Sequence, residues 1–194
     1  DSIVRLPELV TAVARHGMPA VALTDQCNLF GAVKFYKAAL QQGVKPIFGA
    51  DLWVDAPELP DGKALLPLLC RTDTGFLNLK RLITRSYEQA QRAGIPVLPA
   101  DWLTADAVRG LTALSGAGAG ELGFWLRESP NDKAAAYLDA MRECFGGEYH
   151  IELQRTGRRG EEQHIERAVA LASREGCALV ATGDVRFLRQ EDFE

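Results

Sequence analysis

The hydrophobic positions at the start of the chain recur three and four residues apart: Leu6, Leu9, Val10 and Val13. This spacing predicts a helix over residues 6–15 with one buried face. Gly17 and Pro19 follow it, and both residue types are common just beyond a helix end. Residues 20–23 then form a short apolar run, which predicts a buried strand.

The rest of the chain repeats this alternation of strand and helix patterns. Further strands are predicted at residues 47–54, 65–69, 111–114, 149–153 and 179–182, and further helices at residues 31–41, 76–92, 132–144 and 161–174. Residues 55–62 are rich in Pro, Gly and Asp and predict a turn. Repeated alternation implies parallel strands joined by helical crossovers, so an α/β barrel and a doubly wound sheet both fit.

Composition narrows the function classes. The chain has 194 residues, of which 47% are hydrophobic, so we expect a single folded unit over residues 1–194. The net charge of −4 argues against an autonomous nucleic-acid binder. The four cysteines form no C-x-x-C pair, which indicates reduced thiols in a cytoplasmic protein. We find no apolar run long enough for a membrane span. The chain opens without Met, so we expect it to be a fragment of a longer protein.

Polar residues follow or lie within several predicted strands. Asp25, Ser115 and Asp184 each come after a strand, whereas Asp51 and Glu152 lie within or near the end of theirs. Because active sites of α/β barrels gather at the carboxyl ends of the strands, we expect carboxylates from distant parts of the chain to converge on one rim.

Six stretches, in order and covering nearly the whole chain, closely resemble the PHP domain (polymerase and histidinol phosphatase) of the bacterial DNA polymerase III alpha subunit. They span residues 17–36, 43–51, 74–79, 114–116, 152–157 and 181–187. The resemblance implies a distorted (βα)7 barrel, which this chain would contain without its two ends. In metal-binding members, histidines and acids at the rim hold up to three metal ions. These ions support phosphoester hydrolysis, including 3′–5′ exonuclease action in some polymerases.

The chain departs from the family's metal site at most positions that can be aligned. These positions are Asp25, Gln26, Asp51, Leu65, Ala117, Asp184 and Arg186. The family's opening His-x-His would precede Asp1. Gln26 and Arg186 stand where imidazoles are expected, Leu65 replaces a histidine, and Ala117 replaces a cysteine. Arginine is permanently charged and cannot coordinate a cation, so we expect Arg186 to occupy the place of the metal and to pair with Asp25, Asp51 or Asp184.

The resemblance is closest to the proteobacterial alpha subunits, in which this domain is thought to be a vestigial hydrolase kept as a scaffold. It implies a metal-free domain without catalytic residues of its own. The implied partners are the remaining polymerase chain and the proofreading 3′–5′ exonuclease (epsilon) subunit. DNA and Mg²⁺ would bind to the polymerase domains of the longer protein, a DNA-directed DNA polymerase of replication.

Two enzymatic interpretations remain open in addition to the scaffold role. Asp25, Asp51, Glu152 and Asp184 could hold Mg²⁺ or Mn²⁺ through oxygen ligands, as in a metal-dependent phosphoesterase, pyrophosphatase or 3′–5′ exonuclease. Residues 118–123 match G-x-G-x-x-G between a predicted strand and helix, which could form a dinucleotide loop. We favour a turn that uses glycine for backbone freedom.

The remaining candidates are single residues and one loop. Of the histidines, His16 is expected at a helix end, His164 on a solvated helix face, and His150 on a strand with its side chain outward. Arg155, Arg158 and Arg159 form a basic loop that could meet phosphate or an acidic partner, although a solvated loop is the simpler interpretation. If exposed, Phe30, Trp53 and Trp125 could mark a partner surface, but core packing is the default.

Overall fold

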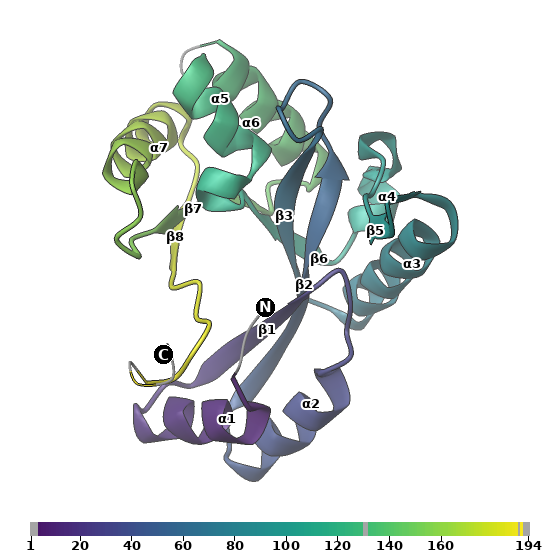
Figure 1. Cartoon of the computed structure of the whole chain (residues 1–194), viewed down its shortest axis with the longest axis vertical. Helices are drawn as coiled ribbons and strands as arrows, with labels where there is room; N and C mark the ends of the chain where they lie inside the picture. The colour runs from purple at the N-terminus through teal and green to yellow at the C-terminus, as the bar shows by residue number, and fades with distance from the viewer. Residues whose placement is uncertain (1–3, 130–131, 190, 192–194) are drawn as a thin grey trace.

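A curled sheet of six strands forms the centre of the computed structural model, which describes residues 4–129, 132–189 and 191 (Figure 1). The strands are β1 (Ala20–Gln26), β2 (Lys45–Asp55), β3 (Lys63–Cys70), β6 (Leu111–Leu114), β7 (Tyr149–Gln154) and β8 (Leu179–Thr182), and they lie in this order across the sheet. In the described residues, the edge strands β1 and β8 do not pair with each other. The curl is therefore an incomplete, distorted barrel.

The strand directions correct one sequence expectation. β1–β2, β6–β7 and β7–β8 are parallel pairs, but β3 is antiparallel to both of its neighbours. The reason is the short connection over residues 56–62, which joins β2 to β3 as a hairpin, whereas a parallel pair needs a crossover of a dozen or more residues. The prediction that all strands are parallel was wrong for this one strand.

Helices surround the outer side of the curled sheet (Figure 1). They are α1 (Leu6–Arg15), α2 (Ala32–Gln41), α3 (Asp73–Gln89), α4 (Ala105–Val108), α5 (Glu121–Glu128), α6 (Lys133–Cys144) and α7 (Glu161–Glu175). Two 3-10 turns (Ala100–Trp102 and Ala117–Ala119) and a small β4–β5 pair (Gln91–Arg92 with Ile95–Pro96) complete the structure. Within the described residues, every helix is too short or too polar to cross a membrane.

Alternation along the strands separates a buried outer face from a less buried inner face. Leu52, Leu66 and Leu68 lie on the outer face in the main hydrophobic cluster under α3 and α5–α7. A second cluster, with Val10 and Phe35 at its centre, fills the space between α1, α2 and the β1–β2 edge. Each fully buried side chain of this kind contributes roughly 1.5–3 kcal/mol of burial free energy. The core therefore lies outside the curl, and the inner face carries polar residues such as Asp51 beside apolar ones such as Leu65.

The predicted elements occur where the periodicity placed them. The first helix and the strand over Leu111–Leu114 have the predicted bounds. The helix expected over residues 76–92 begins earlier, at Asp73, because the Thr72 hydroxyl caps it by accepting from the Gly75 amide at 3.1 Å. It ends at Gln89, where the chain turns into β4.

Candidate functional site

The carboxyl ends of the parallel strands bring several polar side chains to one rim on the inner face of the sheet. In the β1–β2 ladder Gln26 lies opposite Asp51, and in the β7–β8 ladder Gln154 lies opposite Thr182. Glu152 lies two residues before Gln154 and so faces the same side. These positions come from both ends of the chain, as the strand-end argument predicted.

Asp51 is the rim carboxylate with the most strongly perturbed acidity. Burial raises its pKa from 3.8 to about 6, and a hydrogen bond from the Thr24 side chain opposes the rise. The charges of Glu152 and Asp184 raise this pKa further, whereas the charge of Arg186 lowers it. Three acids and one cation therefore influence one another across the rim.

Glu152 is buried at the centre of the rim, with 3% of its surface exposed. Its Oε1 accepts hydrogen bonds from the Thr182 hydroxyl and, at 3.2 Å, from Gln154 Nε2. Its Oε2 is buried without a partner among the described residues. Burial raises the pKa of Glu152, and hydrogen bonds from Thr182, Gln154 and the Gly116 backbone work in the opposite direction.

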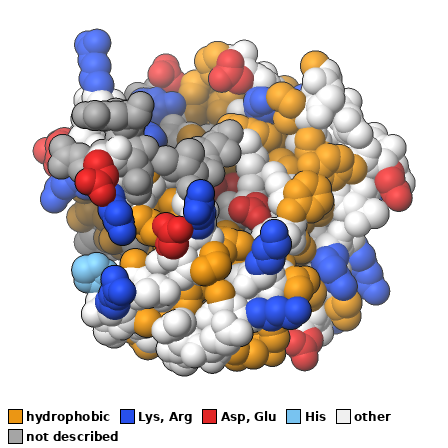
Figure 2. All heavy atoms as spheres, turned by 60° about the horizontal axis from the view of Figure 1, so that its bottom comes forward, with side chains coloured by type: hydrophobic (Ala, Val, Ile, Leu, Met, Phe, Trp, Pro, Cys, Tyr) orange, Lys and Arg blue, Asp and Glu red, His pale blue; other side chains and the backbone are white. Residues whose placement is uncertain are grey.

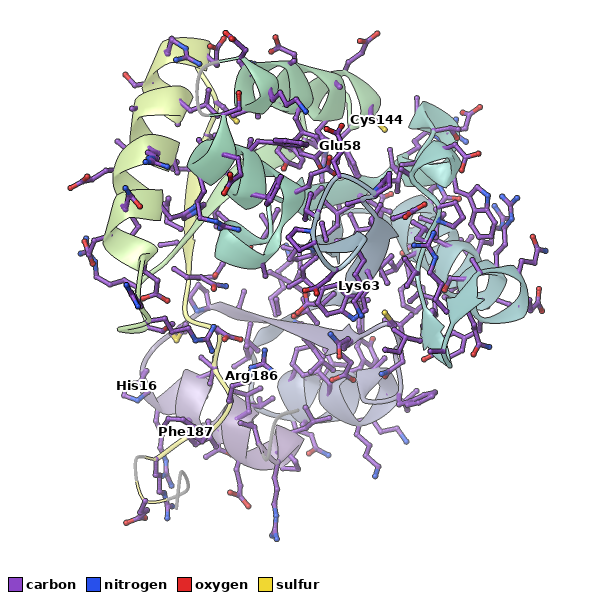
Figure 3. The ribbon with its side chains drawn as sticks, turned by 45° about the horizontal axis from the view of Figure 1, so that its top comes forward. His16, Glu58, Lys63, Cys144, Arg186 and Phe187 are labelled. Atoms are coloured by element: carbon purple, nitrogen blue, oxygen red, sulfur yellow. The ribbon has the colours of Figure 1, made fainter. Side chains whose placement is uncertain are left out.

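Asp184 is held between two guanidinium groups. Its Oδ1 accepts from Arg186 Nε at 2.8 Å, and its Oδ2 accepts from Arg158 at 2.7 Å. The backbone of Asp184 is left-handed (φ 43°), a conformation that Asp tolerates better than most residues. The segment after β8 carries Arg186 from the β7–β8 side of the curl toward α1 and β1 (Figures 1 and 3). Both carboxylate oxygens of Asp184 are thus engaged by cations of the chain itself.

Asp25 lies on the other side of the sheet. It alternates with Thr24 and Gln26, and its Oδ2 accepts from the Gly31 amide at 3.2 Å at the start of α2. A Cβ at Gly31 would lie 2.9 Å from this oxygen, so glycine permits the close approach. Asp25 therefore caps a helix, and the structure does not bring it to the rim.

The other predicted rim positions carry no charged donor. Gln26 is exposed at the end of β1, Leu65 lies on the inner face of β3, and Ala117 is buried in the turn after β6. A Cβ at Gly116 would lie 2.3 Å from the Leu65 carbonyl oxygen, so these two backbones touch. Neither the alkyl side chain of Leu65 nor that of Ala117 can coordinate a cation.

The basic loop after β7 is largely neutralised by nearby acids. Arg155 makes two bonds to Glu162, at 2.8 and 3.0 Å, and Arg158 pairs with Asp184. Glu161 accepts from the amides of residues 156, 157 and 158, which lowers its pKa together with the Thr156 hydroxyl. Arg159 is exposed.

In the glycine-rich turn over residues 118–123, glycines allow backbone segments to pack closely against each other. A Cβ at Gly120 would lie 1.7 Å from the Ser115 carbonyl oxygen, and one at Gly123 would lie 2.1 Å from the Ala117 carbonyl oxygen. Such contacts cannot form, so both positions need glycine. The amide of Gly120 is also used, since it donates to the Gly116 carbonyl.

Several single-residue expectations need correction. His164 is buried at 6% exposure because α7 turns this face toward the sheet, and its ring lies beside the Glu152 backbone without a fully formed hydrogen bond among the described residues. His150 points to the inner face beside Glu148.

Trp125 is buried in the main cluster and Trp53 packs against it, whereas Phe30 is 87% exposed. His16 ends α1, as expected.

Sequence reasoning missed the polar residues that organise the rim. Thr24, Gln154 and Thr182 all hydrogen-bond a rim carboxylate. The period of two along β1 and β7 could have found Thr24 and Gln154, since each lies two residues from a candidate already chosen. The pairing of Arg158 with Asp184 depends on loop geometry, so no periodicity in the sequence predicts it.

The donor set of this rim does not fit a catalytic metal centre. Such a centre needs three protein ligands and an open position. Asp184 is occupied by two guanidinium groups, which leaves Asp51 and one oxygen of Glu152. Across the described ranges, no group of three His, Cys, Asp or Glu side chains is arranged to hold a metal ion.

Comparison with known proteins gives the same family as the sequence motifs. The family model of the PHP domain matches residues 1–156. Over 194 residues the chain is 46% identical to the DNA polymerase III subunit alpha of Pseudomonas aeruginosa and 40% identical to that of Escherichia coli. All of the chain is covered in both cases, but it spans only 16% and 17% of the length of these curated relatives.

Two solved structures share the fold at low sequence identity. An amidohydrolase from Chromobacterium violaceum, with bound sulfate and no metal, aligns with a TM-score of 0.63 at 15% identity and covers 96% of this chain and 83% of its own. A two-domain protein from Bacteroides vulgatus, which contains a predicted PHP-like metal-dependent phosphoesterase, aligns with a TM-score of 0.57 at 14% identity, covering 96% and 48%. These similarities support the fold alone.

Proposed function

Because the chain belongs to the PHP domain family and resembles DNA polymerase III alpha subunits over its whole length, we propose that it is the PHP domain of such a subunit and serves there as a metal-free scaffold. The longer protein would be a DNA-directed DNA polymerase of replication, acting in the cytoplasm. Its polymerase domains, rather than this domain, would bind DNA and Mg²⁺.

The observation that carries the proposal is the engagement of Asp184 by Arg158 and Arg186. A hydrolase of this fold would need the last rim carboxylate free to bind a divalent ion. Here that carboxylate accepts two charge-assisted hydrogen bonds, at 2.7 and 2.8 Å. Such bonds to ionised groups are stronger than neutral ones. A cation that is part of the chain thus supplies the charge that a metal would supply.

The same pairing supports an architectural role. Arg158 belongs to the loop after β7, and Arg186 belongs to the segment after β8. Asp184 joins these two connections, and the charge of Arg186 also reaches Asp51 on β2. The rim therefore joins the connections after β7 and β8 through side chains of the chain itself, and its charge extends to β2. We propose that a domain organised in this way supports neighbouring domains and a docked subunit, the proofreading exonuclease.

Metal analysis of the full-length alpha subunit tests the first part of the proposal. After incubation with zinc or manganese and gel filtration, we expect no stoichiometric metal in this domain, because the described rim residues do not supply three ligands. Single-stranded DNA and pyrophosphate should remain intact. Stoichiometric metal together with hydrolysis that EDTA abolishes would overturn the proposal. Association with the exonuclease subunit, measured with the intact alpha subunit, tests the docking role separately.

One observation favours a second candidate, a metal-dependent phosphoesterase, pyrophosphatase or 3′–5′ exonuclease. Among the described residues Oε2 of Glu152 is buried and has only the Gly116 backbone amide nearby, at less than full hydrogen-bond geometry, so a cation could bind this oxygen. Protonation would also remove the charge, and the raised pKa of Glu152 favours this explanation. The metal analysis decides between the two, since Glu152→Gln should abolish metal binding only if this oxygen is a ligand.

A further inference from the structure

The connection between β2 and β3 contains the one Asp-Gly pair of the sequence, Asp61-Gly62. Pro60 precedes this pair and sets the φ that the second residue of a β-turn needs. The turn closes through a hydrogen bond from the Gly62 amide to the Leu59 carbonyl at 2.9 Å. Asp61 is exposed, and Gly62 has a left-handed backbone with a φ of 63°. An exposed carboxyl group is thus followed directly by a residue without a side chain.

The carboxylate of Asp61 is free, whereas the chain on both sides of it is held. In the described part of the chain, this carboxylate takes part in no hydrogen bond or ion pair. Before it, Glu58, labelled in Figure 3, pairs with a lysine of α6. After it, Arg92 donates to the Gly62 carbonyl at 3.4 Å and to Oδ1 of Asp55 at 2.9 Å. The side chain of Asp61 can therefore turn toward its own main chain without losing a partner.

The other aspartates of the described ranges are held more firmly. Each lies in a helix or strand or directly before a helix, except Asp184, which pairs with Arg158 and Arg186. Figure 2, which brings the opposite end of the molecule forward, shows lysine or arginine side chains beside several of the acidic ones. Backbone hydrogen bonds of helices and strands fix the main chain, so the following amide cannot turn toward the carboxyl group. Asp61 combines a free side chain with a main chain outside these elements.

We propose that Asp61 is a site of spontaneous covalent modification, which converts it to isoaspartate. The Gly62 amide nitrogen attacks Cγ of the protonated Asp61 carboxyl group and forms a C–N bond, and the carboxyl OH leaves with the amide proton as water. Solvent water then hydrolyses the cyclic succinimide. Opening at the side-chain carbonyl restores aspartate, whereas opening at the main-chain carbonyl leaves the peptide bond running through the side chain. One water molecule is released and one consumed, and nothing is oxidised or reduced.

The surroundings of Gly62 permit the attack. A Cβ at this residue would meet nothing nearer than Nη1 of Arg92, at 4.0 Å, so the turn is not crowded. The amide must first leave the Leu59 carbonyl, but the β2–β3 ladder ends at Asp55 opposite Lys63 and stays intact. A surface turn closed by one exposed hydrogen bond opens more readily than a sheet ladder. The reaction therefore needs only a local opening of the folded protein.

The modification lengthens the main chain of the hairpin by one carbon atom. The Ala56 amide donates to the Gly62 carbonyl at 3.1 Å, and Arg92 holds the same carbonyl. A longer main chain displaces this oxygen, so we expect both contacts to weaken and the Ala56 amide to exchange its hydrogen faster. The site is separate from the rim carboxylates, so this inference does not depend on the proposed metal-free function.

Ageing of the full-length alpha subunit tests the proposal. The protein is kept for several weeks at neutral pH and physiological temperature and is then digested. Electron-transfer fragmentation of the peptide that contains Asp61 distinguishes isoaspartate from aspartate, and a species lighter by one water molecule identifies the succinimide. We expect isoaspartate to accumulate at Asp61 with time. Gly62→Ala should slow this accumulation about fivefold or more, because a side chain restricts the backbone at the attacking nitrogen.

Ala140→Gly is the matched control, because it creates a second Asp-Gly pair at Asp139. This aspartate is exposed and unpaired like Asp61, but it lies in the middle of α6. The helix should hold the following amide, so Asp139 should stay unmodified in the folded protein, whereas both pairs should react in urea. Both variants should keep the circular dichroism spectrum. Absence of isoaspartate at Asp61, equal accumulation at Asp139 in the folded protein, or an unchanged rate in Gly62→Ala would overturn the proposal.

Discussion

Arg186 donates from Nε to Oδ1 of Asp184 at 2.8 Å, across a turn of only two residues. The side chain of Asp184 is 15% exposed and that of Arg186 is 45% exposed, so the pair is partly shielded from water. Arg158 holds the other oxygen of the same carboxylate. Because this ion pair is partly buried at the end of the sheet, it should contribute measurably to the stability of the folded chain.

Replacing Arg186 by histidine should lower the free energy of unfolding by about 0.5–1.5 kcal/mol. The shorter, weakly basic ring loses the bond to Asp184 and the positive charge near Asp51. Urea denaturation at pH 8 measures the change. Arg5→His is the control, because Arg5 and its partner Glu8 are both largely exposed and lie 3.8 Å apart. If both variants unfold at the same urea concentration as the unchanged chain, Arg186 does not act as the cation of the rim.

Replacing Asp51 by asparagine should stabilise the chain at neutral pH. The folded-state pKa of Asp51 is about 6, above its unfolded value of 3.8, so the ionised form opposes folding at pH 7. A shift of about two pKa units corresponds to at most about 3 kcal/mol, and we expect about 1–3 kcal/mol. This gain should shrink as the pH falls through 6 and vanish below about 4, where both states bind the proton.

Unfolding curves of Asp51→Asn between pH 4 and pH 8 check this sign. Asp61→Asn, in the exposed hairpin turn, is the matched control and should leave stability unchanged at every pH. A destabilised Asp51→Asn variant at pH 8 would mean that the ionised carboxylate is needed, for example as the ligand of a cation.

The buried ring of His164 should give the opposite pH dependence. Burial lowers its pKa below the ordinary value of 6.5, so the unfolded state takes up the proton first as the pH falls. Its contribution to stability is present above about pH 6.5 and is lost below it. Replacement by leucine should remove this loss between pH 7 and 5. It should also raise stability at pH 7 by up to about 1 kcal/mol, since an apolar side chain replaces a buried polar ring that has no fully formed hydrogen bond among the described residues.

The pH dependence of the unfolding free energy is compared between His164→Leu and the unchanged chain, which separates the effect of His164 from that of Asp51. Gln163→Leu, at the exposed position beside His164 on α7, introduces the same side chain without removing a titratable group, so it serves as control and should keep the original slope. An unchanged slope in His164→Leu would show that the ring is hydrogen-bonded, for instance to water.

Much of the architecture could be predicted because its signals are local. Apolar spacing located α1 to the residue, and the short run at Leu111–Leu114 located β6. The expectation that carboxylates meet at the strand ends agrees with the structure for Asp51 and Asp184, since the charge of Asp184 raises the pKa of Asp51. These features need only the periods of helices and strands and the direction of parallel strands.

The remaining features depend on contacts that no local pattern encodes. Asp25 was expected to follow a strand as Asp184 does, but it lies within β1, and the pleat turns it toward α2. The acids around His164 suggested a solvated face, but packing of α7 buries it. β3 has the same apolar composition whether it runs parallel or antiparallel, and only the short hairpin connection sets its direction.

The glycine-rich turn after β6 gives the last prediction, which separates a packing role from nucleotide binding. Gly120→Ala would place its Cβ 1.7 Å from the Ser115 carbonyl oxygen, so the backbone must move, and we expect a loss of about 2–4 kcal/mol or failure to fold. Gly118→Ala changes the same motif, but its Cβ would meet nothing closer than Arg127 at 4.0 Å, so it should cost less than about 1 kcal/mol. Thermal unfolding of the two variants, with and without NAD or ATP, provides the measurement. Packing predicts a large difference between the variants and no shift with either nucleotide. A nucleotide-dependent rise in the melting temperature of the unchanged chain, lost in Gly118→Ala, would instead show that this turn binds phosphate.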